Sequence, residues 1–222
     1  MDFRSGYLEL FRWGRAPIRF HWSVPLGAFF FGHMRYVPGF WLGFVLTILI
    51  HELGHAAVVR AVGARVVSVD VLGIGGLCHW AGYTSPLGRA CIAWGGVLAQ
   101  AVLYAVTVLY MTVLGPPETW AMAELESAFT TSNLYIIVLN LLPVPPLDGS
   151  EAWRLPGLLW ERWTKALERS KRARRARDEL RRRERAAHDE VARLEATDEQ
   201  GDRSDPRVEH WFRRDGKDSR SN

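Results

Sequence analysis

The sequence predicts an α-helical integral membrane protein with four transmembrane helices, a short β segment on the cytoplasmic side and a charged C-terminal helix. Uneven charge is the first observation behind this fold class. Residues 1–150 contain eight Lys or Arg and eight Asp or Glu, whereas residues 151–222 contain 20 and 16. The other two observations are long apolar stretches in the first part and a β-branched run between two of them. The first part is apolar enough for a bilayer, and the second is too charged to form a core of its own.

The chain begins with a predicted cytoplasmic or interfacial lead-in, residues 1–19, in which four arginines and the aromatic residues Tyr7, Phe11 and Trp13 suit a membrane interface. This lead-in lacks the pattern of a signal peptide, and nothing in it suggests secretion. Residues 20–150 form the predicted transmembrane core. Its first span, residues 20–32, is short for a bilayer, so a re-entrant or tilted segment is an open alternative.

The second predicted span, residues 39–62, contains His51-Glu52-Leu53-Gly54-His55 in its second half. Residues four apart lie on one face of a helix, so His51 and His55 can present two imidazoles to one metal ion. Glu52 lies beside them as a base, which is the pattern of a zinc hydrolase. The sequence therefore predicts a metal site where a bilayer is expected.

A different pattern follows in residues 66–83, where β-branched residues alternate with polar ones and glycines interrupt the run. This pattern is typical of strands with glycine turns. A sheet edge cannot face lipid because its backbone groups would be unpaired. The segment is therefore expected at the surface or inside a protein-lined cavity.

Two further spans are predicted, at residues 90–114 and 127–142, joined by an acidic connection over residues 118–126. The third span has no charge, and Gly95-Gly96 offers a place for close helix packing. Prolines after residue 142 must end the fourth span.

The arginines predict the orientation, because short loops rich in Lys and Arg stay in the cytoplasm. They put both termini in the cytoplasm of a multi-pass protein, in a cell membrane of bacterial type. His51 then lies roughly 20 Å from the outer end of its helix, at about 1.5 Å per residue. Asp148 follows the fourth span at a similar depth. Because a carboxylate there is costly unless it is paired or bound to metal, Asp148 is the best candidate for a third ligand.

Residues 151–197 are predicted to form a charged cytoplasmic helix, and residues 198–222 a disordered tail. A solvated helix is the favoured interpretation, and contact of its arginines with anionic lipid headgroups is the functional alternative. Nucleic acid is not an expected partner, because no stacking aromatic residues interleave with the arginines. Cys78 and Cys91 show no metal-type spacing, so neither a disulfide nor a cysteine metal site is predicted.

The histidine motif, followed on a later span by Asn140-Leu141-Leu142-Pro143 and then Leu147-Asp148-Gly149, resembles the site-2 protease family of intramembrane zinc metalloproteases. The resemblance covers roughly residues 15–155. It implies one zinc ion per chain bound by His51, His55 and Asp148, with Glu52 as the catalytic base. The implied substrates are membrane-spanning peptides cut near the cytoplasmic face.

The resemblance also implies that Asn140 holds the substrate backbone or stabilises the oxyanion. Gly75 and Gly76 are either ordinary turn glycines or part of an exposed strand that pairs with an unwound substrate. Where family members often have Ala-Gly-Pro and then Asn, this chain has Gly95-Gly96 and then Gln100, a departure expected to affect substrate fit more than metal binding. The competing hypothesis is a non-cleaving, membrane-anchored binding or scaffold protein that uses the basic C-terminal helix.

Overall fold

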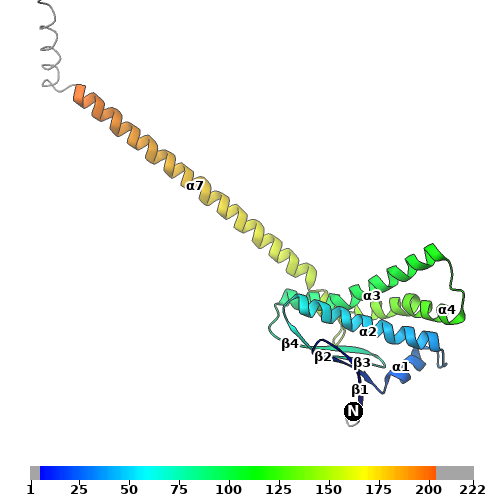
Figure 1. Ribbon diagram of the computed structural model, residues 1–222. Helices are drawn as coiled ribbons and strands as arrows, with labels where there is room; N and C mark the ends of the chain where they lie inside the picture. The colour runs from blue at the N-terminus through cyan, green and yellow to red at the C-terminus, as the bar shows by residue number, and fades with distance from the viewer. Residues whose placement is uncertain (1–5, 204–222) are drawn as a thin grey trace, which may run out of the picture. The chain divides into compact units, whose positions relative to one another are not determined.

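The computed structural model describes residues 6–203, with side chains described as far as Leu194. The chain forms two compact units, one ending at Glu161 and the other beginning at Arg162. The first unit combines a four-stranded sheet with a set of helices (Figure 1). The second unit contains most of one long helix, α7 (Leu155–Arg203).

The sheet has the order β1-β2-β3-β4, and its strands are β1 (Tyr7–Trp13), β2 (Ala16–His21), β3 (Arg65–Leu72) and β4 (Gly75–Ala81). Strands β1 and β2 are antiparallel, as are β3 and β4, whereas β2 and β3 run parallel. The strands expected within residues 66–83 are therefore confirmed as the β3-β4 hairpin.

The expectation of a simple lead-in over residues 1–19 is wrong for residues 7–19, which lie in the β1-β2 hairpin and its turn. Trp13 pairs with Ala16 across a two-residue turn that begins with Gly14, whose φ is 66°. A glycine at the first position of such a turn matches the twist of the two strands. Alternating side chains around this glycine were the signal that the interfacial interpretation overlooked.

The predicted first span, residues 20–32, is also wrong as a helix, because β2 continues to His21 and α1 (Val24–Phe31) has only eight residues. At about 1.5 Å per residue, α1 covers about 12 Å, far less than the roughly 30 Å of a bilayer core. Gly27 of α1 lies directly against the Gly73 carbonyl, where any Cβ would collide. The beginning of the core is thus a strand followed by a short helix packed on the sheet.

Helix α2 (Pro38–Ala61) confirms the helix predicted for the second span and is long and apolar enough to cross a membrane. It provides the long crossover that two parallel strands, here β2 and β3, require. In Figure 1 the sheet lies on one side of α2, and α3 and α4 lie on the other. Where α2 begins, the Gly39 N–H donates to a Glu124 carboxylate oxygen at 3.0 Å, which satisfies one of the free amides of the first turn.

Helix α3 (Pro86–Leu114) confirms the helix predicted for the third span, is also long and apolar enough to cross a membrane, and begins four residues earlier than expected. Ser85 caps it by accepting a hydrogen bond from the Gly88 N–H at 3.1 Å. The helix crosses α2 where Gly54 faces Gly95, and a Cβ on either glycine would meet the backbone of the other helix. Small residues at such a crossing permit the close backbone approach that stabilises helix pairs in membranes.

The fourth region consists of α4 (Trp120–Ser127), a π-helical turn η2 (Ala128–Ser132) and α5 (Asn133–Asn140). The acidic connection predicted over residues 118–126 is therefore mostly helix, capped by the Thr119 hydroxyl. Its glutamates misled the prediction, because Glu124 is used to cap α2 rather than to keep a loop in solvent. The prolines end α5 as expected, and a short α6 (Gly149–Ala152) follows.

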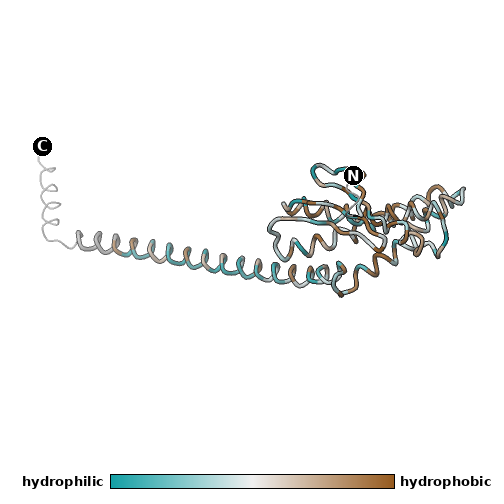
Figure 2. Tube along the Cα trace, turned by 90° about the horizontal axis from the view of Figure 1, so that it is seen from below, coloured by the Kyte–Doolittle hydropathy of each residue, from teal (hydrophilic) through white to brown (hydrophobic). Residues whose placement is uncertain are grey.

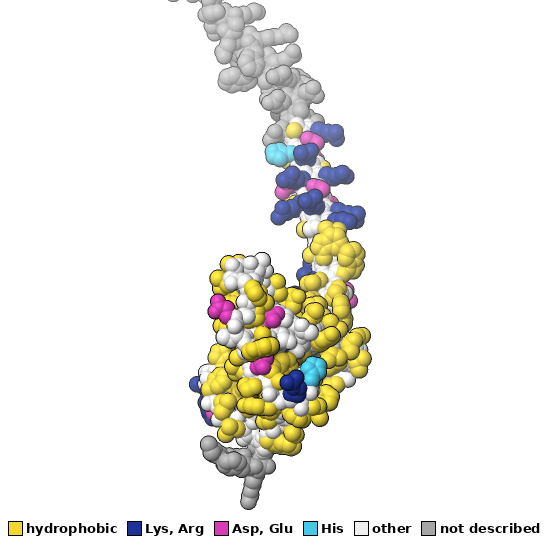
Figure 3. Space-filling view, turned by 90° about the vertical axis from the view of Figure 1, so that its right-hand side faces the viewer, with side chains coloured by type: hydrophobic (Ala, Val, Ile, Leu, Met, Phe, Trp, Pro, Cys, Tyr) yellow, Lys and Arg dark blue, Asp and Glu magenta, His cyan; other side chains and the backbone are white. Residues whose placement is uncertain are grey.

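Apolar side chains also cover much of the outside of the first unit (Figure 3). Along the chain trace, the helices of the first unit are mostly apolar, whereas α7 is mostly hydrophilic (Figure 2). Helix α7 confirms the predicted charged helix, including the Glu179–Arg183 ion pair at 2.7 Å, but it continues to Arg203 rather than ending near residue 197. The rest of the predicted disordered tail, residues 204–222, lies outside the described residues.

Candidate metal centre

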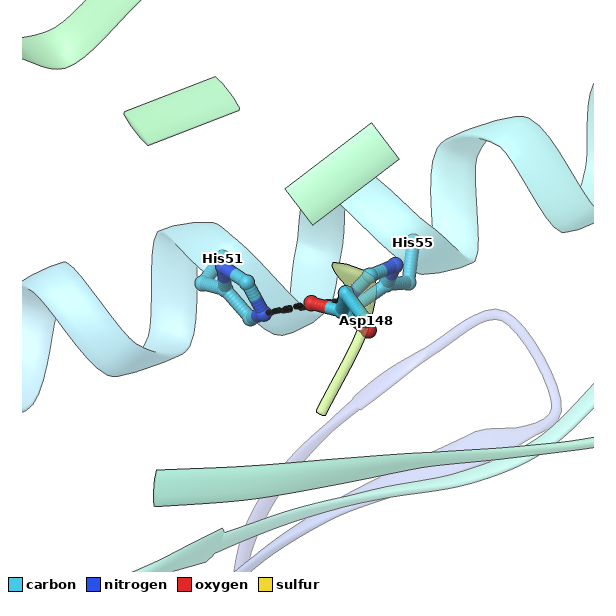
Figure 4. A group of neighbouring side chains, drawn as sticks. All are labelled: His51, His55 and Asp148. Carbon is cyan, nitrogen blue, oxygen red and sulfur yellow. Dashed lines mark hydrogen bonds and ion pairs between the residues drawn. The ribbon is translucent and has the colours of Figure 1, made fainter. Parts of the chain in front are cut away.

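The structure brings together the three predicted metal ligands (Figure 4). One carboxylate oxygen of Asp148 lies 3.0 Å from His51 Nε2 and 3.2 Å from His55 Nε2. The two Nε2 atoms are 2.9 Å apart. Within residues 6–194, this is the one group of three metal-ligating side chains that converges in this way.

The local structure around Asp148 explains why a residue so distant in sequence reaches the histidines. Asp148 precedes α6, and Gly149 lies so close to the Leu141 carbonyl that a Cβ would collide with it. The Trp153 indole donates to the Leu141 carbonyl at 2.7 Å, and the Trp94 indole on α3 donates to the Ala152 carbonyl at 2.9 Å. These contacts hold the turn after α5 against α3, with the carboxylate directed at α2.

The other ring nitrogen of each histidine also has a partner. His51 Nδ1 lies 3.0 Å from Oε1 of Gln100, and His55 Nδ1 lies 2.6 Å from the Ile92 carbonyl. A neutral imidazole has one N–H, and a carbonyl-type oxygen can only accept it, so both rings carry their proton on Nδ1. The expectation that the Gln100 departure touches no proposed ligand is therefore wrong.

This arrangement fits a divalent metal ion. With protons on both Nδ1 atoms, two nitrogen lone pairs and a carboxylate oxygen face one another over 2.9–3.2 Å. Such lone pairs repel unless a cation lies among them, and Asp148 Oδ2 is buried without a hydrogen-bond donor among the described residues. Tetrahedral zinc places its ligand atoms about 3.3 Å apart, close to the spacing found, and two histidines with a carboxylate leave a fourth position open.

Space for the rings depends on Gly96 of α3. A Cβ at Gly96 would lie 2.5 Å from His55 Nε2 and 2.6 Å from His51 Cε1. Real Cβ atoms do not approach other atoms so closely, and both rings are already held by Gln100 and Ile92. Gly96, the second glycine of the predicted packing pair, therefore makes room for the histidine rings. Gly95 instead allows the close crossing of α2 and α3.

Glu52 lies next to the ligands on α2 and is 2% exposed. Gly76 of β4 packs directly on its carboxylate group, and a side chain at residue 76 would displace it. The hairpin predicted near the motif helix thus forms one wall beside the predicted base.

A cavity of about 710 Å³ extends from this site. Its lining includes all seven residues that the sequence singled out, namely His51, Glu52, His55, Gly75, Gly76, Asn140 and Asp148. Cys78 also lines it, and burial raises the pKa of its thiol to about 12. Both cysteines are free, as predicted.

Other predicted polar residues lie outside the cluster. Asn133 joins two helices, because its side-chain amide donates to the Gln100 carbonyl of α3 at 2.9 Å. His21 bonds to the Ser23 hydroxyl, and His79 pairs with Asp70, so neither reaches the ligands.

The sequence interpretation missed three contributors to the site: Gln100, Gly96 and the Ile92 carbonyl. A backbone carbonyl leaves no signal in the sequence. Gly96 and Gln100 do leave a signal in the sequence, because they are four residues apart and therefore share a face of the same helix.

The chain is similar to known proteins over this region. It is 31% identical over 165 residues to Rip3 of Mycobacterium tuberculosis, by its name a candidate zinc metalloprotease; the match covers 65% of this chain and 42% of Rip3. It is also 31% identical over 139 residues to stage IV sporulation protein FB of Bacillus subtilis, covering 60% of this chain and 43% of that protein. The chain thus spans less than half the length of these relatives. No family model matches it.

A solved structure has the same fold. The site-2 protease from Methanocaldococcus jannaschii superposes with a TM-score of 0.51 at 22% identity, over 67% of this chain and 70% of that one. The fold combines two candidate membrane-spanning helices with a buried cluster of metal-ligating side chains. In sequence and in fold the chain is therefore similar to proteins of the site-2 protease type, as its motifs indicated.

Proposed function

We propose that this chain is an intramembrane zinc metalloprotease that hydrolyses peptide bonds in transmembrane or membrane-inserted substrates near the cytoplasmic face. The observation that carries the proposal is the convergence of His51, His55 and Asp148 beside Glu52, on a helix long and apolar enough to cross a bilayer. Buried polar groups in such a helix are costly and are typical of functional sites.

His51, His55 and Asp148 would hold one zinc ion, which lowers the pKa of water and polarises a carbonyl group. Glu52 would accept the proton of the attacking water and deliver it to the leaving amine as the peptide bond breaks. Its burial supports this role, because the carboxylate is kept away from bulk solvent and faces the cavity. Gly76 leaves room for this carboxylate, because a Cβ at residue 76 would collide with it.

The cavity and the free edge of the sheet support a peptide substrate. Strand β4 is an outer strand, and five of its residues line the cavity: Gly75, Gly76, Leu77, Cys78 and Trp80. A peptide bond inside a helix is shielded by its own hydrogen bonds, so cleavage needs an extended segment. An unwound substrate would add to β4 as a further strand, with Asn140 on the opposite wall to hold its backbone.

We propose a topology of four membrane crossings with both termini in the cytoplasm. Helices α2 and α3 provide two crossings. The α4-η2-α5 stretch, about 30 Å long at 1.5 Å per residue, would provide the last. The first would be β2 with α1, since these return the chain from the sheet to the beginning of α2. Arg60, Arg65 and Arg89 then lie at one end with the basic helix, as cytoplasmic segments do.

The domain division predicted from the sequence fits this topology: a protease core over residues 20–150 and a charged helix from residue 151. Helix α7 would lie on the cytoplasmic side. Its basic first half would attract anionic headgroups, by about 1 kcal/mol for each Lys or Arg near the surface.

The proposal is tested by zinc content and cleavage of single-span membrane peptides by the purified chain in detergent. Glu52→Gln should keep zinc and lose cleavage by about 100-fold or more. His55→Ala and Asp148→Asn should weaken both, and chelation should stop cleavage until zinc is returned. Normal cleavage by the Glu52→Gln variant would exclude the mechanism.

Deleting residues 162–222 separates this function from a non-cleaving binding protein. A protease should still cleave a minimal peptide, because every site residue lies before residue 162. A scaffold that works through its basic helix should lose its partner instead.

A further inference from the structure

The two histidines of the metal centre are oriented in different ways. His55 donates its Nδ1–H to a backbone carbonyl, that of Ile92, at 2.6 Å. His51 instead faces the side chain of Gln100, with its Nδ1 3.0 Å from Oε1. One ligand is therefore fixed by the fold itself, and the other by a side chain that a single substitution can remove.

Gln100 is held where it meets His51. The residue is 0% exposed. Its backbone carbonyl accepts a hydrogen bond from the Asn133 side chain at 2.9 Å. Asn133 is itself fully buried, and it follows the π-helical turn, where its backbone N–H donates to Ala128 and its side-chain amide to Phe129. These bonds tie the Gln100 backbone to the fourth helical region, and complete burial leaves its side-chain amide little space to leave the ring.

The amide has a defined direction. If Nε2 of Gln100 faced His51, the ring would have to accept at Nδ1 and carry its proton on Nε2, which points at His55 and Asp148. That tautomer would block metal binding, because a metal ligand needs a lone pair on Nε2. With Oε1 toward the ring, Nε2 of Gln100 has no partner among the described residues, and burying an unpaired donor is unfavourable. Nε2 of Gln100 thus stays unpaired so that Oε1 of the same amide can accept the Nδ1–H of His51.

We infer that Gln100 is a positioning residue of the metal centre, which fixes the tautomer and ring orientation of His51 through Oε1. The inference rests on the proposed zinc site. Groups that hydrogen-bond to ligating histidines also raise the basicity of the ligand, and their loss weakens metal binding by about 10–100-fold. Gln100 would act on the reaction only through His51.

Two substitutions of similar shape separate this role from packing. Gln100→Glu keeps an acceptor for the Nδ1–H, whereas Gln100→Met keeps the length of the side chain without any acceptor. Positioning predicts that Gln100→Met binds zinc about 10–100-fold more weakly and that Gln100→Glu stays within about threefold of the native chain. Packing alone predicts the reverse order, since methionine suits an apolar site and a buried unpaired carboxylate does not.

The experiment measures the zinc dissociation constant of the purified full chain by competition with a chelator of known affinity. Thr107→Val on α3 is the matched control, because it removes a hydroxyl bonded only within its own helix, to the Leu103 carbonyl. Cleavage by Gln100→Met should recover in excess zinc, which a misfolded protein would not allow. If Gln100→Met fails to fold, retained zinc in Gln100→Glu still supports the inference, and its loss overturns it.

Native zinc affinity in a folded Gln100→Met variant would also overturn the inference and leave the proposed protease function intact. A native chain that binds no zinc would instead refute the proposed function itself. The two failures are therefore distinguishable in one set of titrations.

Discussion

Helices α2 and α3 are both apolar and long enough to cross a bilayer, yet they differ in what surrounds them. Of the most apolar 18-residue window in each helix, 56% is buried in α2 and 11% in α3. Helix α2 lies between the sheet and the other helices and carries Glu52 and both histidines. Helix α3 turns most of its surface outward. Hydropathy therefore predicts which segments enter a membrane, but burial decides which of them can hold a buried charge.

Helix α3 also contributes to the site, although most of its surface faces outward. Helix α3 presents a narrow inner stripe to α2 and the site, formed by Gly95 at the helix crossing and by Gly96 and Gln100 at the histidines. Its outward face carries large exposed apolar side chains, including Leu98, Val102, Val106, Leu109 and Val113. The residues of α3 are thus tightly constrained on the inner stripe, whereas those on the outward face are free to vary. Substitutions on the two helices can test how sharp this division is.

The largest effect is expected from Gly96→Val on the inner stripe of α3. Its side chain would occupy the space of the two imidazole rings, so zinc affinity and cleavage should both fall by about 100-fold or more, as when a ligand shell is disrupted. Zinc content of the purified protein and cleavage of a membrane peptide would be measured together. Gly157→Ala is the control, because its Cβ would meet nothing within 4 Å. Native zinc content in the Gly96→Val variant would contradict the close contact described here.

An effect confined to stability should separate the two helices directly. Phe44 of α2 is 2% exposed and stacks on Phe31 at 5.0 Å, so Phe44→Ala should lower the free energy of unfolding by about 3–5 kcal/mol. Val106→Ala on the outward face of α3 should change it by only about 0.5 kcal/mol. Denaturant unfolding in the same detergent gives both values. Equal losses would mean that α3 is packed as tightly as α2.

The smallest of the three effects depends on depth in the bilayer. Val106→Lys should oppose membrane insertion of α3 by about 2.5–3.5 kcal/mol, because residue 106 lies well inside the helix. Leu114→Lys, at the last residue, should be tolerated, since a lysine near a helix end extends its ammonium group to the interface. Insertion is measured as the membrane-integrated fraction of newly made protein. Similar fractions for the two variants would show that this face of α3 does not meet lipid.

The same contrast explains which parts of the fold the sequence predicted. The second and third spans were predicted nearly to the residue, because uninterrupted apolar runs have few alternative structures. The β1-β2 hairpin was missed because arginines beside aromatic residues suggested a membrane interface. In the structure, Arg19 of that hairpin forms a bidentate ion pair with buried Asp70. Such a pairing joins segments about 50 residues apart, which a local pattern cannot reveal.

The sequence by itself determined the chemistry of the site. The four-residue spacing of His51 and His55 follows from helix geometry, and an aspartate after an apolar span needs a cation or a partner. Only the tertiary structure decided how that chemistry is held. It placed Gln100 on His51, the Ile92 carbonyl on His55, Gly96 beneath both rings and Gly76 against Glu52. These contacts depend on the separation and rotation of packed elements, which arise from the whole fold rather than from any one segment.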